Sequence, residues 1–182
     1  SRVPQYMIPH EMLGRKVAGV NCSDILEIRK PDVEFRKLVN DGTGDALLGA
    51  MRDVQKVIRQ ASGLSLEDFG VFGSLLHSFH SPLFSDIDLT IYGRRNAEKL
   101  RDTLRELYKI GSSRFRNEFD TTESIRKKNW DFQNLSPEEY VWHQRRKFIY
   151  ALFKDEKTGR TIKTEFEPVK DWKEIRNEYE TL

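Results

Sequence analysis

Apolar residues recur at helical spacing in two parts of the chain. The run over residues 46–62 places aliphatic side chains three and four positions apart and is closed by Gly63. The run over residues 97–110 repeats this spacing and is closed by Gly111. Because residues three or four apart lie on the same face of a helix, both runs predict amphipathic helices that bury one face.

Four shorter segments have the pattern of strands. Residues 69–72 form a short apolar run, and residues 85–92 alternate polar with aliphatic side chains. Residues 148–153 and 161–169 predict two more strands, joined by a hairpin turn that contains Gly159. Together with the helices, these strands predict an α+β fold in which a short mixed sheet is flanked by helices.

Two further helices are predicted from their ends. The first follows Gly73 and Ser74, takes its first turns from Leu75 onward, and ends at Pro82. The second begins where Ser136 can cap it, with a proline in the first turn.

The chain before residue 41 has a mixed pattern. Pro4, Pro9 and Pro31 interrupt its short apolar stretches. We therefore expect residues 1–40 to be an irregular lead-in with one or two short elements, the remainder of a preceding region, and residues 41–182 to form the domain.

Composition narrows the class of protein without identifying a partner. The 182 residues fit one domain, and 31 Lys and Arg against 29 Asp and Glu give a net charge of +2. This balance excludes a constitutive nucleic-acid coat but allows local basic patches. A single cysteine, Cys22, excludes an internal disulfide framework, and no apolar run approaches the roughly 20 residues that a membrane helix needs. We therefore expect a cytoplasmic protein that does not enter membranes.

The segment with recognisable chemistry lies between the first two predicted strands. Gly73 and Ser74 leave a strand for a helix, where backbone N–H groups can bind a phosphate and where glycine lets the backbone approach closely. Asp86 and Asp88 then alternate along the next strand, so their carboxylates share one face. Hard oxygen ligands at this spacing suit Mg²⁺ that keeps part of its water shell and binds phosphates.

Residues 70–93 resemble the signature of the polymerase-beta-type nucleotidyltransferase superfamily, in which Gly-Ser after a strand is followed by an Asp-x-Asp strand. Within it, the chain is most similar to small archaeal and bacterial single-domain members. The resemblance implies a polymerase-beta-like nucleotidyltransferase domain. It further implies that Gly73 and Ser74, with Ser85 at the start of the second motif, hold the phosphates of a nucleoside triphosphate.

The resemblance also implies a metal site. Asp86 and Asp88 would bind two Mg²⁺ ions, or Mn²⁺ in their place, and a third carboxylate on a later strand would complete the site as metal ligand or general base. Glu165 and Glu167 are the alternatives, since they share one face of the strand over residues 161–169. We prefer Glu165, which lies in mid-strand, whereas Glu167 abuts a proline.

Other basic residues could take part in binding. His77 could contact a nucleotide, although a surface or helix-capping role competes with this. Arg145, Arg146 and Lys147 could reach a triphosphate or an RNA backbone, or could be solvated surface charge. Bases and aromatics over residues 126–132 are typical of single-strand binders, but we favour a place in the core for these aromatics.

These observations predict a Mg²⁺-dependent enzyme that transfers a nucleoside monophosphate from a triphosphate to a hydroxyl of RNA, protein or a small molecule and releases pyrophosphate. The alternative is a catalytically silent module with the same fold that binds RNA or a protein partner.

Overall fold

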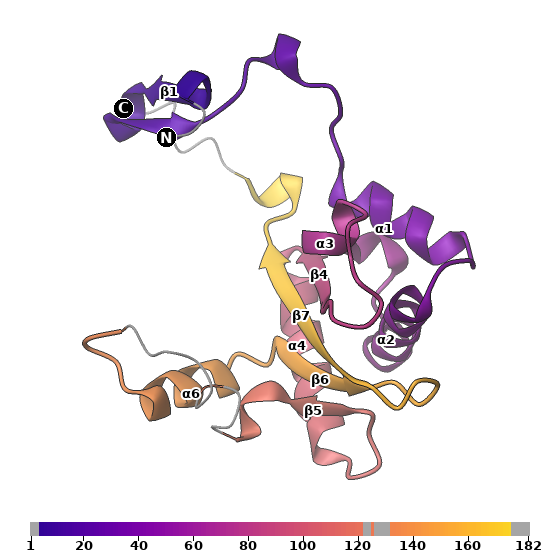
Figure 1. Ribbon diagram of the computed structural model, residues 1–182. Helices are drawn as coiled ribbons and strands as arrows, with labels where there is room; N and C mark the ends of the chain where they lie inside the picture. The colour runs from indigo at the N-terminus through magenta and orange to yellow at the C-terminus, as the bar shows by residue number, and fades with distance from the viewer. Residues whose placement is uncertain (1–3, 122–124, 126–131, 176–182) are drawn as a thin grey trace.

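A five-stranded mixed sheet forms the centre of the protein in a computed structural model that describes residues 4–121, 125 and 132–175 (Figure 1). Its strands are β3 (Phe69–Val71), β4 (Ile87–Tyr92), β5 (Phe115–Asn117), β6 (Tyr150–Lys154) and β7 (Thr161–Val169). Their order across the sheet is β3-β4-β7-β6-β5. The central β4–β7 pair is parallel and its neighbours are antiparallel, so the sheet is mixed, as predicted.

Helices form where the periodicity predicts them. The helices are α1 (Pro31–Asn40), α2 (Ala46–Ser62), α3 (Gly73–Leu76), α4 (Arg94–Lys109) and α6 (Pro137–Arg145). Gly63 ends α2 in the left-handed conformation, and Ser136 and Glu139 form a capping box at the start of α6, so both predicted helix ends are confirmed. Helix α4 starts three residues before the predicted 97, because the Glu174 carboxylate accepts the backbone N–H of Arg94 and stabilises an earlier first turn.

The core lies between one face of the sheet and the helices α2 and α4. Alternate strand residues point into it and are completely buried, among them Leu89, Phe153 and Phe166. Because successive side chains of a strand point to opposite faces, Asp88 and Glu165 lie on the other face of the sheet. The helix-covered face therefore stabilises the fold, and the opposite face carries the charged residues.

The helix predicted from Leu75 to Pro82 is much shorter than expected. Helix α3 ends at Leu76, and Ser78 has a positive φ of 59° that breaks the helical path. The N–H of Phe79 then donates to the carbonyl of Ser74. An irregular loop, rather than a helix, therefore leads to β4.

The segment before residue 41 contains both regular and extended structure. Helix α1 lies within the stretch for which the sequence predicted irregular structure, and its Phe35 is completely buried against Phe69, with ring centroids 5.9 Å apart. Further upstream, β1 (Met7–His10) and β2 (Arg15–Ala18) form a hairpin that stands away from the main sheet (Figure 1).

No helix in the described part of the chain has the length and apolar character needed to cross a membrane.

Candidate functional site

The chain leaves β3 directly beside the carboxylate of Asp88. The N–H of Phe72 donates to the carbonyl of Asp88, and Gly73 follows with a positive φ of 61°. A Cβ at position 73 would lie 2.5 Å from Oδ2 of Asp88. Glycine is therefore needed here for two reasons: a backbone conformation that other residues rarely adopt, and the space that the carboxylate fills.

Strand pairing brings two predicted acidic residues together. Asp88 on β4 is the register partner of Glu165 on β7, and paired residues of adjacent strands are separated by about 5 Å. Glu167 pairs with Thr90, two residues farther along β4, so the geometry favours Glu165 as the residue beside Asp88. Asp86 precedes β4 rather than lying within it as predicted, yet it is close enough to act electrostatically on Asp88.

The carboxyl group of Asp88 is held in an unfavourable environment for its charge. Burial, followed by repulsion from Glu165 and Asp86, raises its pKa to about 6, and Lys163 only partly offsets this. Acidic groups crowded in this way gain most from a cation brought to them.

A lysine that the sequence pattern did not single out already supplies one cation. The ammonium of Lys163 lies 2.6 Å from Oε1 of Glu165 and 3.7 Å from Oε1 of Glu118. Although burial opposes the charged form, the contact with Glu165 and the nearby carboxylates raise the pKa of Lys163. Glu165 is thus bound to a side chain of the protein itself.

The donor set fits Mg²⁺ only in part. No three His, Cys, Asp or Glu side chains within the described residues converge into a metal-binding group. Asp86 and Asp88 nevertheless offer hard carboxylate oxygens, and Mg²⁺ is commonly bound through one or two carboxylates, waters and substrate phosphates. The residues present therefore fit an ion shared between this pair and a bound phosphate, whereas Glu165 is engaged by Lys163.

The loop before Asp86 is fixed by hydrogen bonds that leave little freedom around Ser85. Its Oγ accepts the N–H of Ser81 at 2.8 Å, and its own N–H donates to the Ser81 carbonyl at 3.0 Å. Arg160 donates to the carbonyls of Pro82 and Ser85 at 2.8 and 2.7 Å. The predicted nucleotide-binding Ser85 thus has a clear structural role, and Arg160 positions the start of β4.

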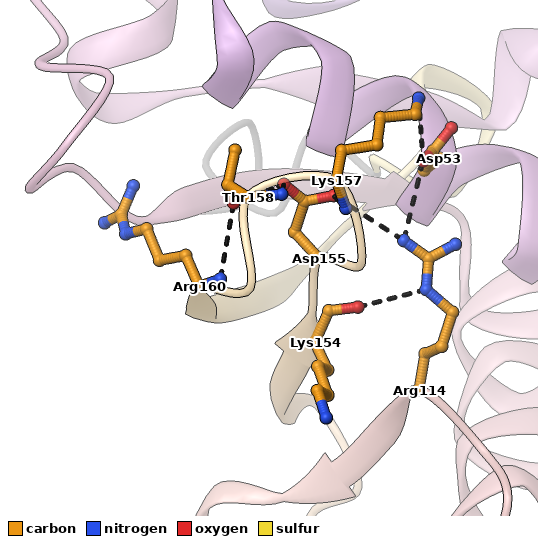
Figure 2. Close-up of polar contacts among 7 residues, drawn as sticks. All are labelled: Asp53, Arg114, Lys154, Asp155, Lys157, Thr158 and Arg160. Atoms are coloured by element: carbon orange, nitrogen blue, oxygen red, sulfur yellow. Dashed lines mark hydrogen bonds and ion pairs between the residues drawn. The ribbon is translucent and has the colours of Figure 1, made fainter.

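Arg160 is itself placed by the turn between β6 and β7, which is organised around a buried carboxylate (Figure 2). Asp155 is 1% exposed, accepts hydrogen bonds from the backbone and hydroxyl of Thr158, and lies 3.8 Å from Arg114. Arg114 also reaches Asp53 on α2, at 3.5 Å. This network fixes the hairpin turn to the body of the protein and so fixes the base of Arg160.

The remaining predicted residues have other partners. The exposed ring of His77 stacks on Phe79, at a centroid distance of 5.9 Å. Its neighbour His80 contacts the cap of helix α2 instead, with Nε2 2.9 Å from Oδ2 of Asp45. Each of these contacts agrees with the surface or capping role that competed with nucleotide binding.

The basic residues at the end of α6 also contact neighbouring side chains. Arg145 pairs with Asp120 at 3.2 Å, and Arg146 stacks 3.4 Å above the ring of Trp142. Lys147 lies 5.8 Å from the ring of Tyr150, the register partner of Glu165. Arg146 and Lys147 line a hollow of about 560 Å³ together with Arg101 and His143.

The predicted bases and aromatics at 126–131 lie outside the described residues, and the remaining one, Phe132, is 60% exposed rather than part of the core.

Lys163 and Arg160 were not predicted as site residues, and the sequence contains a usable pattern for only one of them. Lys163 stands two positions before Glu165, so strand alternation alone places both on one face. Arg160 lies in a turn, where no periodicity indicates a direction. Only the folded chain brings it to the loop before Asp86.

Comparison with known proteins gave no match to a protein-family model, to a curated protein or to a solved structure.

Replacement of Gly73 by alanine should move the Asp88 carboxylate. Gly63→Ala is the matched control, because its φ of 69° is equally strained but no atom lies within 4 Å of the position that its Cβ would take. Both variants should lose about 1 kcal/mol of unfolding free energy through backbone strain. Only Gly73→Ala should shift the titration of Asp88, followed by carboxyl ¹³C NMR, from about 6 towards the usual range. An unchanged titration in that variant would contradict the close contact.

Asp88→Asn should make the protein more stable at neutral pH. The pKa of Asp88 is about 6 in the folded state and about 3.9 when unfolded, so ionisation above pH 6 disfavours folding. Allowing for solvent screening, we expect a gain on the order of 1 kcal/mol in urea denaturation at about pH 7.5, which disappears below about pH 4. Asp102→Asn, at an exposed ion pair, is the control and should give no such gain. If the effect of Asp88→Asn did not change with pH, the raised pKa of Asp88 would be contradicted.

Arg160→Met should loosen the loop before β4 while keeping the apolar stem of the side chain. Two charged hydrogen bonds to carbonyls are lost, which should cost about 2 kcal/mol and speed amide hydrogen exchange over residues 81–85. Arg94→Met removes a contact with the exposed Glu98 and should cost under about 0.5 kcal/mol. Equal costs for the two variants would show that Arg160 has no special role.

Proposed function

We propose that this protein is a Mg²⁺-dependent nucleotidyltransferase with a polymerase-beta-like fold. The observation that carries the proposal is the contact between Gly73 and the carboxylate of Asp88, at a point where Asp86 and Glu165 act on the same group. A glycine that exposes the backbone next to crowded carboxylates is the arrangement that the resemblance of residues 70–93 implies for a triphosphate and its metal ion.

Each residue has a role that its position supports. The backbone at Gly73 and the hydroxyl of Ser74 would contact the terminal phosphates, which need close approach to the main chain. Asp86 and Asp88 would hold Mg²⁺, which when bound supplies the positive charge that a triphosphate needs next to carboxylates. Arg160 and Ser85 keep the loop before these aspartates in place.

The reaction is a displacement at the α-phosphorus of the triphosphate. The oxygen of the acceptor hydroxyl forms a bond to this phosphorus, the bond to the β-phosphate oxygen breaks, and pyrophosphate leaves with the electron pair. The hydroxyl proton passes to a base, and Glu165 is the carboxylate beside Asp88 that could receive it. Lys163, in contact with Glu165, holds that carboxylate in position.

One observation favours the second candidate, a catalytically silent module. The ammonium of Lys163 binds Glu165 at 2.6 Å, where an active enzyme of this type would need the carboxylate for metal binding or proton transfer. In a silent module this ion pair would replace the metal, and Asp86 and Asp88 would remain without a catalytic task. The unaltered chain and Lys163→Met together distinguish the two candidates. An enzyme should transfer nucleotide and lose this activity in Lys163→Met, whereas a silent module should show no transfer in either form and should keep its partner binding in Lys163→Met.

Calorimetric titration with each of the four ribonucleoside triphosphates tests the proposed function. In the presence of Mg²⁺ we expect a dissociation constant around micromolar for at least one of them, about −8 kcal/mol. Binding should disappear in EDTA and in Asp86→Asn/Asp88→Asn, since the phosphates then face no shared cation. Asp102→Asn again serves as a control that removes a carboxylate elsewhere and should bind normally.

Either of two outcomes would contradict the proposal. The first is an absence of binding to all four triphosphates. The second is binding that persists unchanged in EDTA and in the double variant, which would place the triphosphate somewhere other than at these aspartates.

A further inference from the structure

A hollow of about 450 Å³ lies at the β5–β6 side of the sheet and is lined mostly by basic and hydroxyl side chains. Its wall contains the turn 111–113 and the side chains of Arg114, Arg116, Lys154 and Thr161, against the single carboxylate of Glu156. A hollow with several cations and hydroxyl donors suits the oxygens of phosphate groups, which arginine in particular binds through paired hydrogen bonds.

The cations of this hollow differ in how they are used. Arg114 is committed to the fold, because it donates to the Lys154 carbonyl, pairs with Asp53 and stacks 4.3 Å from the Phe153 ring. Arg116 and Lys154 are exposed and have no ion-pair partner among the described residues. Figure 2 shows the Lys154 side chain extending away from the network around Asp155. Two cations therefore remain for a ligand.

Strand register connects the hollow with the candidate active site. Arg116 pairs with Leu152 on β6, and Leu152 pairs with Lys163 on β7. Lys163 in turn acts electrostatically on Asp86, at the start of β4. Since these residues share one face of the sheet, a row leads from the basic hollow across three strand spacings, about 14 Å, to the aspartates.

We propose that this hollow binds the phosphodiester backbone of a single-stranded nucleic acid acceptor and directs its terminal hydroxyl towards Asp86 and Asp88. This inference rests on the proposed function, since it names the acceptor of the same reaction. A chain of phosphates fits because two cations, Arg116 and Lys154, face the hollow, and the apolar Leu152, the register partner of Arg116, can contact a sugar or base.

Fluorescence anisotropy with a labelled single-stranded RNA of mixed sequence tests the proposal, in EDTA and without triphosphate. Binding of the full chain should weaken as salt rises, because phosphate contacts release counterions. Arg116→Gln/Lys154→Gln should weaken binding at least about tenfold and reduce the slope of log K against log salt by about 1.4, the value for two phosphate contacts on a single strand.

The control removes the same charge from the opposite side of the sheet. Arg95 and Lys99 are exposed on α4, and Arg95→Gln/Lys99→Gln should leave RNA binding within about twofold of the unaltered chain. Equal losses in the two double variants would overturn the proposal, because binding would then follow net charge alone. An absence of RNA binding at low salt would overturn it as well.

A labelled polyglutamate peptide distinguishes an acidic protein partner from a nucleic acid. Binding of this peptide as tightly as RNA, with the same loss in Arg116→Gln/Lys154→Gln, would assign the hollow to an acidic protein and overturn the proposal. Failure of the proposed function is recognised separately, by triphosphate titration. Arg116→Gln/Lys154→Gln should bind triphosphate normally, and Asp86→Asn/Asp88→Asn should bind RNA at least as tightly as the unaltered chain.

Discussion

The arrangement of the charged face depends on the space between the backbone of Gly73 and the carboxylate of Asp88. Because the chain must turn out of β3 where Phe72 is hydrogen bonded to Asp88, the main chain passes directly beside this side chain. Any Cβ at position 73 would compete for the volume that the carboxylate occupies. The turn therefore determines both where α3 begins and where the Asp88 oxygens lie, and a local backbone requirement becomes a requirement on the chemistry of the site.

The second constraint is the parallel pairing of β4 with β7, which places Glu165 beside Asp88. Carboxylates at this distance repel one another, and burial together with this repulsion raises the pKa of Asp88. Lys163 offsets part of it from within the same strand. Because Lys163 is bound to Glu165, the charge of Asp88 is only partly compensated, and an external cation would stabilise it further.

Local sequence signals account for the end of α2, for the start of α6 and for the alternation of strand faces. Gly63 and Ser136 act through contacts within a few residues, so pattern alone predicted them. The same alternation placed Asp88 and Glu165 on faces that could meet. The β4–β7 register could not be predicted, because it is a pairing between segments far apart in the chain. The length of helix α3 was overestimated because Ser78 adopts a left-handed conformation, which a serine in the sequence does not predict. Arg160 was missed because a turn residue has no periodicity to follow.

The near-neutral composition conceals a basic hollow and a group of carboxylates on one face of the sheet. The hollow that contains Arg116 and Lys154 attracts an anion, while the carboxylates of Asp86 and Asp88 repel it. A polyanion therefore has a favourable path from the β5 edge and an unfavourable last step unless a cation is present at the aspartates. The turn between β6 and β7 contributes to both ends of this path. Asp155 anchors the turn, and Arg160 extends from it to the loop before β4. Lys154, just before the turn, faces the hollow. Burial of the Asp155 carboxylate costs stability unless the group is paired. Its contacts with Thr158 and Arg114 provide this pairing, and they also orient two separate parts of one surface.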